Sequence, residues 1–131
     1  MFLLDSETCL QLLKGGDKAV TDRLRGQRPS AISLSSMAKA ELLSLARGSH
    51  RVEDRLEALK RFVEPLTVLP FDDRCAEEYG QNCAQLGSRA LALEPADLIN
   101  AATARAYDAS LVTRDARRFN DITGLWLVQW K

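Results

Sequence analysis

Four acidic side chains are candidates for chemistry because each lies beside a strand-like stretch or in a helix next to one. They are Asp5, Glu41, Asp97 and Asp115. Asp5 directly follows the apolar run 2–4, and Asp115 comes two residues after the strand-like stretch 109–113. Ligands of open parallel sheets bind beyond the carboxyl ends of the strands. The positions of Asp5 and Asp115 therefore predict an acidic site at that edge of a sheet.

The other two acids belong to predicted helices. Asp97 is near the start of the segment 94–108, which leads into the strand-like stretch, and Glu41 lies in mid-helix between Ala40 and Leu42. Each acid also has an ordinary explanation. The three aspartates occupy positions where capping or helix-dipole interactions favour an acid. A glutamate in mid-helix is not a cap, but it could lie on the solvated outer face.

Carboxylates that converge without cationic partners repel one another and raise each other's pKa values, and a divalent metal relieves this repulsion. Oxygen ligands suit Mg²⁺ or Mn²⁺, which can activate water and stabilise the charge on a phosphodiester under attack. Zinc chemistry is disfavoured because the chain has no CxxC spacing and a single histidine, His50. Neither a GxxxxGK[ST] nor a GxGxxG motif is present.

Strand-like and helix-like stretches alternate along the chain, which predicts how these acids are positioned. The strands are expected at 2–5, 31–35, 67–71, 109–113 and 125–130, with Pro70 ending the third strand or placing it at an edge. The helices are expected at 6–16, 17–27, 36–48, 51–65, 72–90 and 94–108, with a short helix or turn at 114–122. The pattern predicts one α/β domain over residues 1–131, a parallel sheet of about five short strands flanked by helices on both faces.

The composition is that of an ordinary globular protein. The 131 residues are 46% apolar and 27% charged with a formal net charge of zero, so no global basic field attracts nucleic acid. Three cysteines in helix-like stretches, the lack of a signal-peptide pattern and the lack of any apolar run of roughly 20 residues favour a soluble cytoplasmic protein without membrane contact.

Several phrases of the chain resemble a known family over essentially its whole length. They are the acid after the first strand, AISLSSMAKAELL, VLPFDDRCAEEYG, EPADLINAATARAYDASLVTRDARRF and GLWLVQW. In this order and spacing they resemble the PIN-domain ribonucleases, and specifically the VapC-like toxins of bacterial toxin–antitoxin pairs.

The resemblance implies an endoribonuclease that depends on Mg²⁺ or Mn²⁺. It implies catalytic roles for Asp5, Glu41, Asp97 and Asp115, with Asp5, Asp97 and Asp115 as metal ligands. Supporting roles fall on the hydroxyls of Ser6 and Thr113. The family also implies a homodimer held inactive by a cognate antitoxin protein, with RNA as substrate and with DNA contacted only through the antitoxin.

The chain departs from the family pattern at two places. Ser6-Glu7 stands where Thr-Asn is common, so an extra negative charge replaces an amide, and Asn100 stands where a larger aliphatic residue is usual. Asn100 could cost some packing or could face the site. Arg114 and Arg117 are the candidate phosphate-binding residues within a wider group that includes Arg89, Arg105 and Arg118; an ordinary solvated surface is the alternative.

Other functions remain open at this point. A haloacid-dehalogenase-like phosphatase needs a second aspartate two residues after the first, where this chain has Glu7, and a receiver domain needs a lysine after its last strand. Both are disfavoured. A catalytically silent interaction module that keeps the fold, and a metal-dependent DNA nuclease, are the remaining alternatives.

Overall fold

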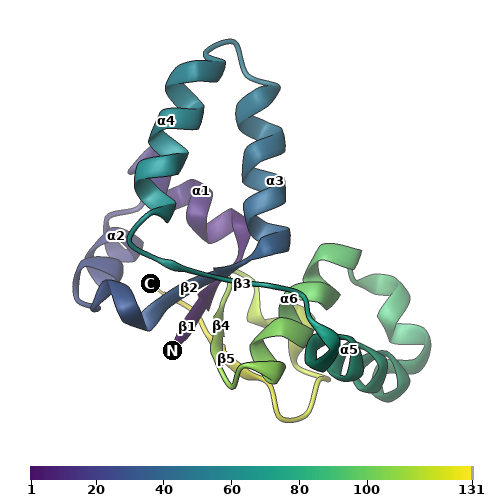
Figure 1. The fold of residues 1–131 in the computed structure, drawn as a ribbon. Coiled ribbons are helices and arrows are strands. Elements are labelled where there is room, and N and C mark those ends of the chain that lie inside the picture. Colours follow the sequence, from purple (N-terminus) through teal and green to yellow (C-terminus); the bar gives the residue numbers. More distant parts are fainter. Residues whose placement is uncertain (131) are drawn as a thin grey trace.

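Five short parallel strands form one sheet in the order β3-β2-β1-β4-β5 (Figure 1). The computed structural model describes residues 1–130. The strands are β1 (Phe2–Leu4), β2 (Ile32–Ser35), β3 (Thr67–Leu69), β4 (Ser110–Val112) and β5 (Trp126–Val128). The chain starts in the centre of the sheet, builds β2 and β3 on one side, and then crosses to build β4 and β5 on the other. The reversal of strand order therefore lies between β1 and β4, the place where ligands of such sheets bind.

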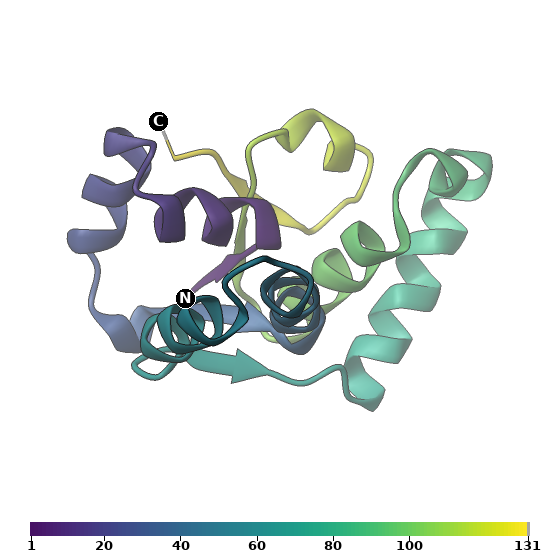
Figure 2. The same ribbon diagram turned by 90° about the horizontal axis from the view of Figure 1, so that it is seen from above.

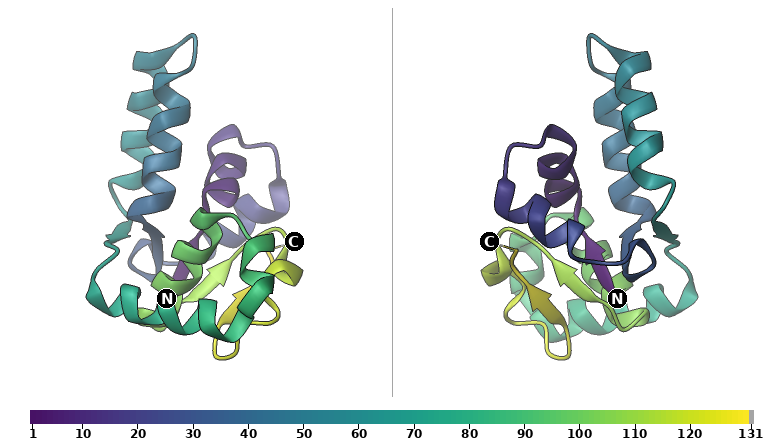
Figure 3. Two further views of the ribbon diagram at one scale, coloured as in Figure 1. Left: turned by 90° about the vertical axis from the view of Figure 1, so that its right-hand side faces the viewer. Right: turned by 90° about the vertical axis from the view of Figure 1, so that its left-hand side faces the viewer.

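Within residues 1–130, six α-helices and three short 3₁₀ helices connect the strands. The α-helices are α1 (Ser6–Lys14), α2 (Lys18–Arg25), α3 (Ser36–Arg47), α4 (Val52–Val63), α5 (Asp73–Leu86) and α6 (Pro95–Ala106). The 3₁₀ helices are η1 (Pro29–Ala31), η2 (Gly87–Ala92) and η3 (Ala116–Phe119). Helices α3 and α4 form an antiparallel pair that extends well beyond the sheet (Figure 3). None of the helices in residues 1–130 is long and apolar enough to cross a bilayer.

The ends of the helices follow local sequence signals. Four helices begin at a residue whose side chain accepts a backbone N–H bond three positions later: Asp5, Asp17, Ser35 and Asp72. Helix α1 ends at Gly15, whose φ of 65° is in the left-handed region that glycine adopts without strain. Gly87 likewise has a positive φ and ends α5, so the expected helix over 72–90 is an α-helix followed by η2.

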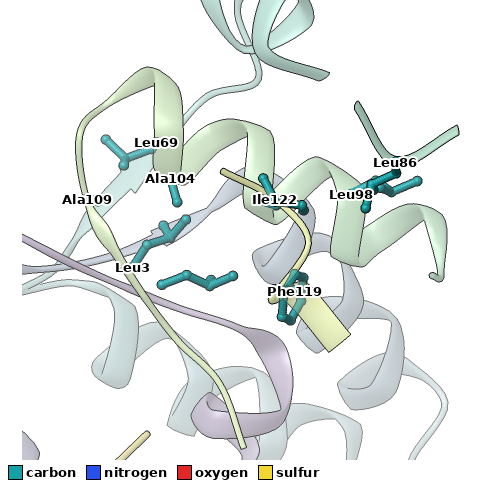
Figure 4. Close-up of a cluster of buried hydrophobic side chains, with 10 residues drawn as sticks. Leu3, Leu69, Leu86, Leu98, Ala104, Ala109, Phe119 and Ile122 are labelled. Carbon is teal, nitrogen blue, oxygen red and sulfur yellow. The ribbon is translucent and has the colours of Figure 1, made fainter. Parts of the chain in front are cut away.

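Two hydrophobic cores cover the two faces of the sheet, because neighbouring strand residues point in opposite directions. Leu3 belongs to the core under α5 and α6, which also holds Phe119 (Figure 4). Leu4 belongs to the core under α1, α2, α3 and α4. The view from above shows the same separation of the two groups of helices (Figure 2). The predicted fold class, a five-stranded parallel sheet with helices on both faces, is confirmed.

Individual strands are shorter than expected. The third strand ends at Leu69, immediately before Pro70, and it is an edge strand as its proline predicted. The last strand covers only Trp126–Val128 of the expected 125–130. The stretch 114–122, expected as a short helix or turn, contains η3.

Candidate active site

An acidic cavity of about 190 Å³ lies beyond the carboxyl end of β1, where the strand order reverses. Its walls come from the start of α1, from α3, from the start of α6 and from η3. They are formed by Asp5, Ser6, Glu7, Glu41, Glu94, Ala96, Asp97, Asn100 and Arg118. A larger hollow of about 320 Å³ between α1, α3 and α4 is lined by no acidic residue, so we place the chemistry in the acidic cavity.

Asp5 combines the two roles that its sequence position allowed. Its side chain is buried, with 5% of the residue exposed, and its Oδ1 accepts a 2.8 Å hydrogen bond from the Thr8 N–H at the start of α1. The backbone N–H of Asp5 donates to the Val112 carbonyl of β4 at 3.3 Å. Capping therefore fixes the Asp5 carboxylate at the switch point, where the residue lines the cavity.

Glu41 faces the cavity, so the alternative that it lies on the outer face of its helix is wrong. Its Oε1 is completely buried and has no hydrogen-bond partner within residues 1–130. A buried carboxylate oxygen without a donor is costly, and such atoms call for a ligand, an ion or a water molecule. Glu41 thus carries unsatisfied acceptor capacity inside the acidic cavity.

Asn100 also faces the cavity and supports the helix that carries Glu41. Its Oδ1 accepts a hydrogen bond from the Ser35 hydroxyl. The same hydroxyl accepts a 2.9 Å bond from the Ala38 N–H and caps α3. Asn100 is 3% exposed, and its polar contact with Ser35 joins α3 to α6. Of the two alternatives for Asn100, the structure shows the one in which the residue faces the cavity.

Asp97 lies in the first turn of α6 and pairs with an arginine. Its Oδ2 is 2.9 Å from Nη1 of Arg118, and its backbone N–H donates to the Glu94 carbonyl at 3.0 Å. Burial raises the pKa of the Asp97 carboxyl, the Arg118 guanidinium opposes this, and the negative charge of Asp5 raises the pKa further. Repulsion between carboxylates, the reason for expecting a metal, therefore operates in this cavity.

Asp115 lies outside the residues that line the cavity but is linked to it through Arg118. Its Oδ2 is 3.9 Å from Nε of Arg118, the same side chain that binds Asp97. Its backbone N–H is 3.4 Å from Oγ1 of the buried Thr113. The alternative of a capping role for the Asp115 side chain is wrong, because within the described chain this carboxylate accepts no backbone hydrogen bond of η3.

The arginines differ in how they relate to the cavity. Arg118 lines it, whereas the Arg117 side chain is 92% exposed and lies 3.7 Å from Asp115. Arg114 is half exposed, and its Nη1 is 3.8 Å from Oε1 of Glu7 at the cavity wall. The sequence predicted Arg114 and Arg117 as phosphate-binding residues and placed Arg118 only in the wider group. Glu94 was not predicted, although its place directly before Pro95 at the start of α6 was a usable signal.

The donor atoms of this cavity fit a hard divalent ion, since they are carboxylate oxygens and one of them, Oε1 of Glu41, lacks a partner. Among residues 1–130, however, no three acidic, histidine or cysteine side chains are close enough together to hold a metal in this conformation. Two of the three predicted ligands, Asp97 and Asp115, share Arg118 instead.

A parallel sheet covered by helices on both faces, with an acidic cavity where the strand order reverses, characterises the class of domain to which this chain belongs. The family model described as "PIN domain" matches residues 2–125, and the chain belongs to the PIN domain family. The predicted resemblance is thereby confirmed.

Curated relatives are similar over nearly their full length. The tRNA(fMet)-specific endonuclease VapC of Salmonella typhimurium is 29% identical over 129 residues, which cover 98% of this chain and 97% of the relative. Ribonuclease VapC2 of Rickettsia felis is 28% identical over 131 residues, covering 99% of this chain and 98% of the relative.

Solved structures are also similar to this chain over nearly its whole length. VapBC2 from Rickettsia felis bound to a DNA fragment from their promoter has a TM-score of 0.90 and 26% identity, covering 99% of this chain and 98% of that one. DNA-bound VapBC from Salmonella typhimurium also has a TM-score of 0.90, with 28% identity and the same coverage.

Proposed function

We propose that this chain is a metal-dependent endoribonuclease and the toxin of a toxin–antitoxin pair. The observation that carries the proposal is the acidic cavity, where Asp5, Glu41 and Asp97 come from three different elements to line one space. The PIN fold and the VapC names of the full-length relatives support the same reading.

Asp5, Asp97 and Asp115 are the residues that would hold a Mg²⁺ or Mn²⁺ ion. When bound, such an ion supplies Lewis-acid activation of water and stabilises charge on the phosphate. The hydrogen bond from the Thr8 N–H to Oδ1 fixes the Asp5 carboxylate, which lines the cavity. Ser6 lines the cavity beside Asp5, and Thr113 holds the backbone of Asp115. Both hydroxyl residues thus act as supports.

Glu41 is positioned to act on the attacking water. Its buried, unpartnered Oε1 accepts a proton from that water as the water oxygen bonds to phosphorus. The bond from phosphorus to the leaving ribose oxygen then breaks, and that oxygen takes a proton from solvent. Asp97 faces Arg118 across the same cavity. Arg114 and Arg117 are the proposed phosphate contacts at the rim, where their exposure leaves the guanidinium groups accessible to RNA.

An antitoxin is the proposed protein partner, because the solved neighbours are VapBC assemblies. We propose that DNA is contacted only through that antitoxin, since the chain has no net positive charge. A homodimer is also proposed, and Leu91 and Trp126, which are 90% and 66% exposed, are large apolar side chains that an interface would cover. Light scattering should give twice the 14.5 kDa chain mass.

The test is cleavage of total cellular RNA by the purified protein with Mg²⁺ or Mn²⁺, followed by mapping of the new ends. Asp97→Asn should abolish cleavage while circular dichroism stays unchanged. Asp54→Asn on α4, where Asp54 pairs only with Arg51 on the surface, is the control and should cleave normally.

Two alternatives have their own results in this experiment. Cleavage of single-stranded DNA as fast as RNA would identify a DNA nuclease. No cleavage of either nucleic acid, together with no thermal shift by Mn²⁺, would identify a silent interaction module. Full activity of Asp97→Asn would refute the assignment of the site.

A further inference from the structure

The Arg118 guanidinium lies in the acidic cavity beside the carboxylates of Asp97 and Asp115. Its Nη1 is 2.9 Å from Oδ2 of Asp97, and its Nε is 3.9 Å from Oδ2 of Asp115. The Asp97 side chain is 14% exposed, so this ion pair lies mostly inside the protein. The arginine is paired with two of the three carboxylates that the proposed function assigns to a metal, and its single positive charge offsets part of their negative charge.

The Arg118 guanidinium has a buried hydrogen-bond donor that is not satisfied within residues 1–130. Its Nε is buried yet has no hydrogen-bond partner in the described chain, and the distance to Asp115 is too long for such a bond. Leaving a buried donor unpaired carries a free-energy cost. The residue belongs to η3, a helix of only four residues, and a third of its side chain is already exposed. Moving the side chain outward thus breaks one good ion pair and relieves one unsatisfied donor.

We propose, resting on the function proposed above, that Arg118 is a displaceable positioning residue that balances the charge of the cavity and gives up Asp97 when a divalent metal ion binds. A dication and a guanidinium cannot both lie in contact with Oδ2 of Asp97, because two cations at that separation repel strongly in a partly buried site. The displaced guanidinium is left at the rim, where its planar fork suits a phosphate of the RNA.

The test measures Mn²⁺ binding by isothermal titration calorimetry, without RNA. Arg118→Gln removes the competing charge, and its apparent Mn²⁺ affinity should rise roughly fivefold, the scale expected for a partly screened ion pair. Arg118→Lys keeps the charge and should stay close to the wild type. Circular dichroism verifies that each variant is folded.

Arg61→Gln is the matched control. Arg61 lies on α4, its side chain is 74% exposed, and it pairs with Glu57 rather than with a proposed metal ligand, away from the residues that line the cavity. Its removal changes the net charge by the same amount, so its Mn²⁺ affinity should change less than about twofold.

A second titration uses a cleavage-resistant phosphorothioate analogue of single-stranded RNA with saturating Mn²⁺. Arg118→Gln should bind it several-fold more weakly than the wild type, although it binds the metal more tightly. Replacing a residue that only stabilises the fold is not expected to strengthen Mn²⁺ binding while weakening oligonucleotide binding.

Several results would overturn the proposal. They are equal or weaker Mn²⁺ binding by Arg118→Gln, an equal gain in Arg61→Gln, and unchanged oligonucleotide binding. If the wild type and all variants bind no Mn²⁺, the metal-dependent function fails as well. If all of them bind it equally, only the displacement by metal fails.

Discussion

At the scale of single residues, Glu41 shows most clearly that the cavity is arranged for a ligand. One carboxylate oxygen of Asp5 accepts the hydrogen bond that caps α1, and the Asp97 carboxylate is paired with an arginine. Oε1 of Glu41, in contrast, is buried with no hydrogen-bond donor in residues 1–130. A protein that needed Glu41 only for stability would pair this atom. A buried carboxylate oxygen without a hydrogen-bond donor is typical of residues that act on a substrate or a reactive water.

Glu41→Gln should therefore separate activity from stability. The amide has almost the same shape but cannot accept a proton, so RNA cleavage should fall by about a hundredfold or more. The free energy of unfolding should stay within about 1 kcal/mol of the wild type, since no protein hydrogen bond to Oε1 is lost. Cleavage rates and urea unfolding measure the two quantities.

Glu57→Gln, which changes an exposed glutamate of α4 paired with Arg61, is the control for that variant and should be normal in both measurements. Normal cleavage by Glu41→Gln would remove Glu41 from the catalytic group.

At the scale of elements, α3 and α6 carry opposing walls of the site and are joined by one polar contact. The Ser35 hydroxyl caps α3 and donates to Asn100 of α6. Both residues are buried, so the pair is shielded from water. This contact sets the relative position of Glu41 and Asp97, one on each helix.

Ser35→Ala should destabilise the protein by roughly 2–3 kcal/mol, because it removes a helix cap and leaves a buried carbonyl oxygen of Asn100 without its donor. Cleavage should also slow in the folded variant as the two walls lose their fixed separation. Ser36→Ala, at the exposed neighbouring position, should change neither urea unfolding nor cleavage. Equal effects of the two substitutions would contradict this account.

Helices α5 and α6 are joined by a second polar contact, away from the cavity. The Tyr107 hydroxyl donates a 2.6 Å hydrogen bond to Oδ2 of Asp72, the capping residue of α5. This bond, followed by the bond from the Cys75 N–H, lowers the pKa of the Asp72 carboxyl well below its usual range. The guanidinium of Arg74 stacks over the Tyr107 ring at 4.5 Å and adds a further contact.

Tyr107→Phe should lower the melting temperature by a few degrees at pH 7 and much less near pH 2. A depressed carboxyl pKa contributes stability above the unfolded value of 3.8, and this contribution is lost as the pH falls through the folded pKa. Removing the hydroxyl moves the folded pKa back toward 3.8, so the gap between the melting curves should narrow below about pH 4. A gap that is constant from pH 7 to pH 2 would refute the linkage.

At the scale of the whole molecule, the order and type of elements followed from sequence patterns that depend on local chemistry. Pro70 predicted the end of β3 and its place at the edge, and the glycines and capping residues predicted most helix ends. The alternation of strands and helices sufficed for a parallel sheet with two covered faces. The exact strand lengths could not be predicted from the sequence, because the ends of β5 depend on neighbouring strands in the sheet rather than on its own residues.

The site was predictable only in part because side-chain pairing is a tertiary property. Asp5 was predicted as a site residue from its position at the end of a strand-like stretch. Glu41 was predicted because apolar residues surround it in the sequence. Nothing local distinguishes Arg118 from Arg117, its neighbour in the chain, yet one lines the cavity and the other is almost fully exposed. The one-residue difference places them on different sides of the short η3 helix.

Anomalous scattering from a crystal soaked in Mn²⁺ will show whether these carboxylates bind one divalent ion. We expect a manganese peak inside the acidic cavity, in direct contact with Asp97 and at least one other of the proposed acids, with the Arg118 side chain moved away from Asp97. A peak elsewhere, or no peak at saturating Mn²⁺, would refute the metal site.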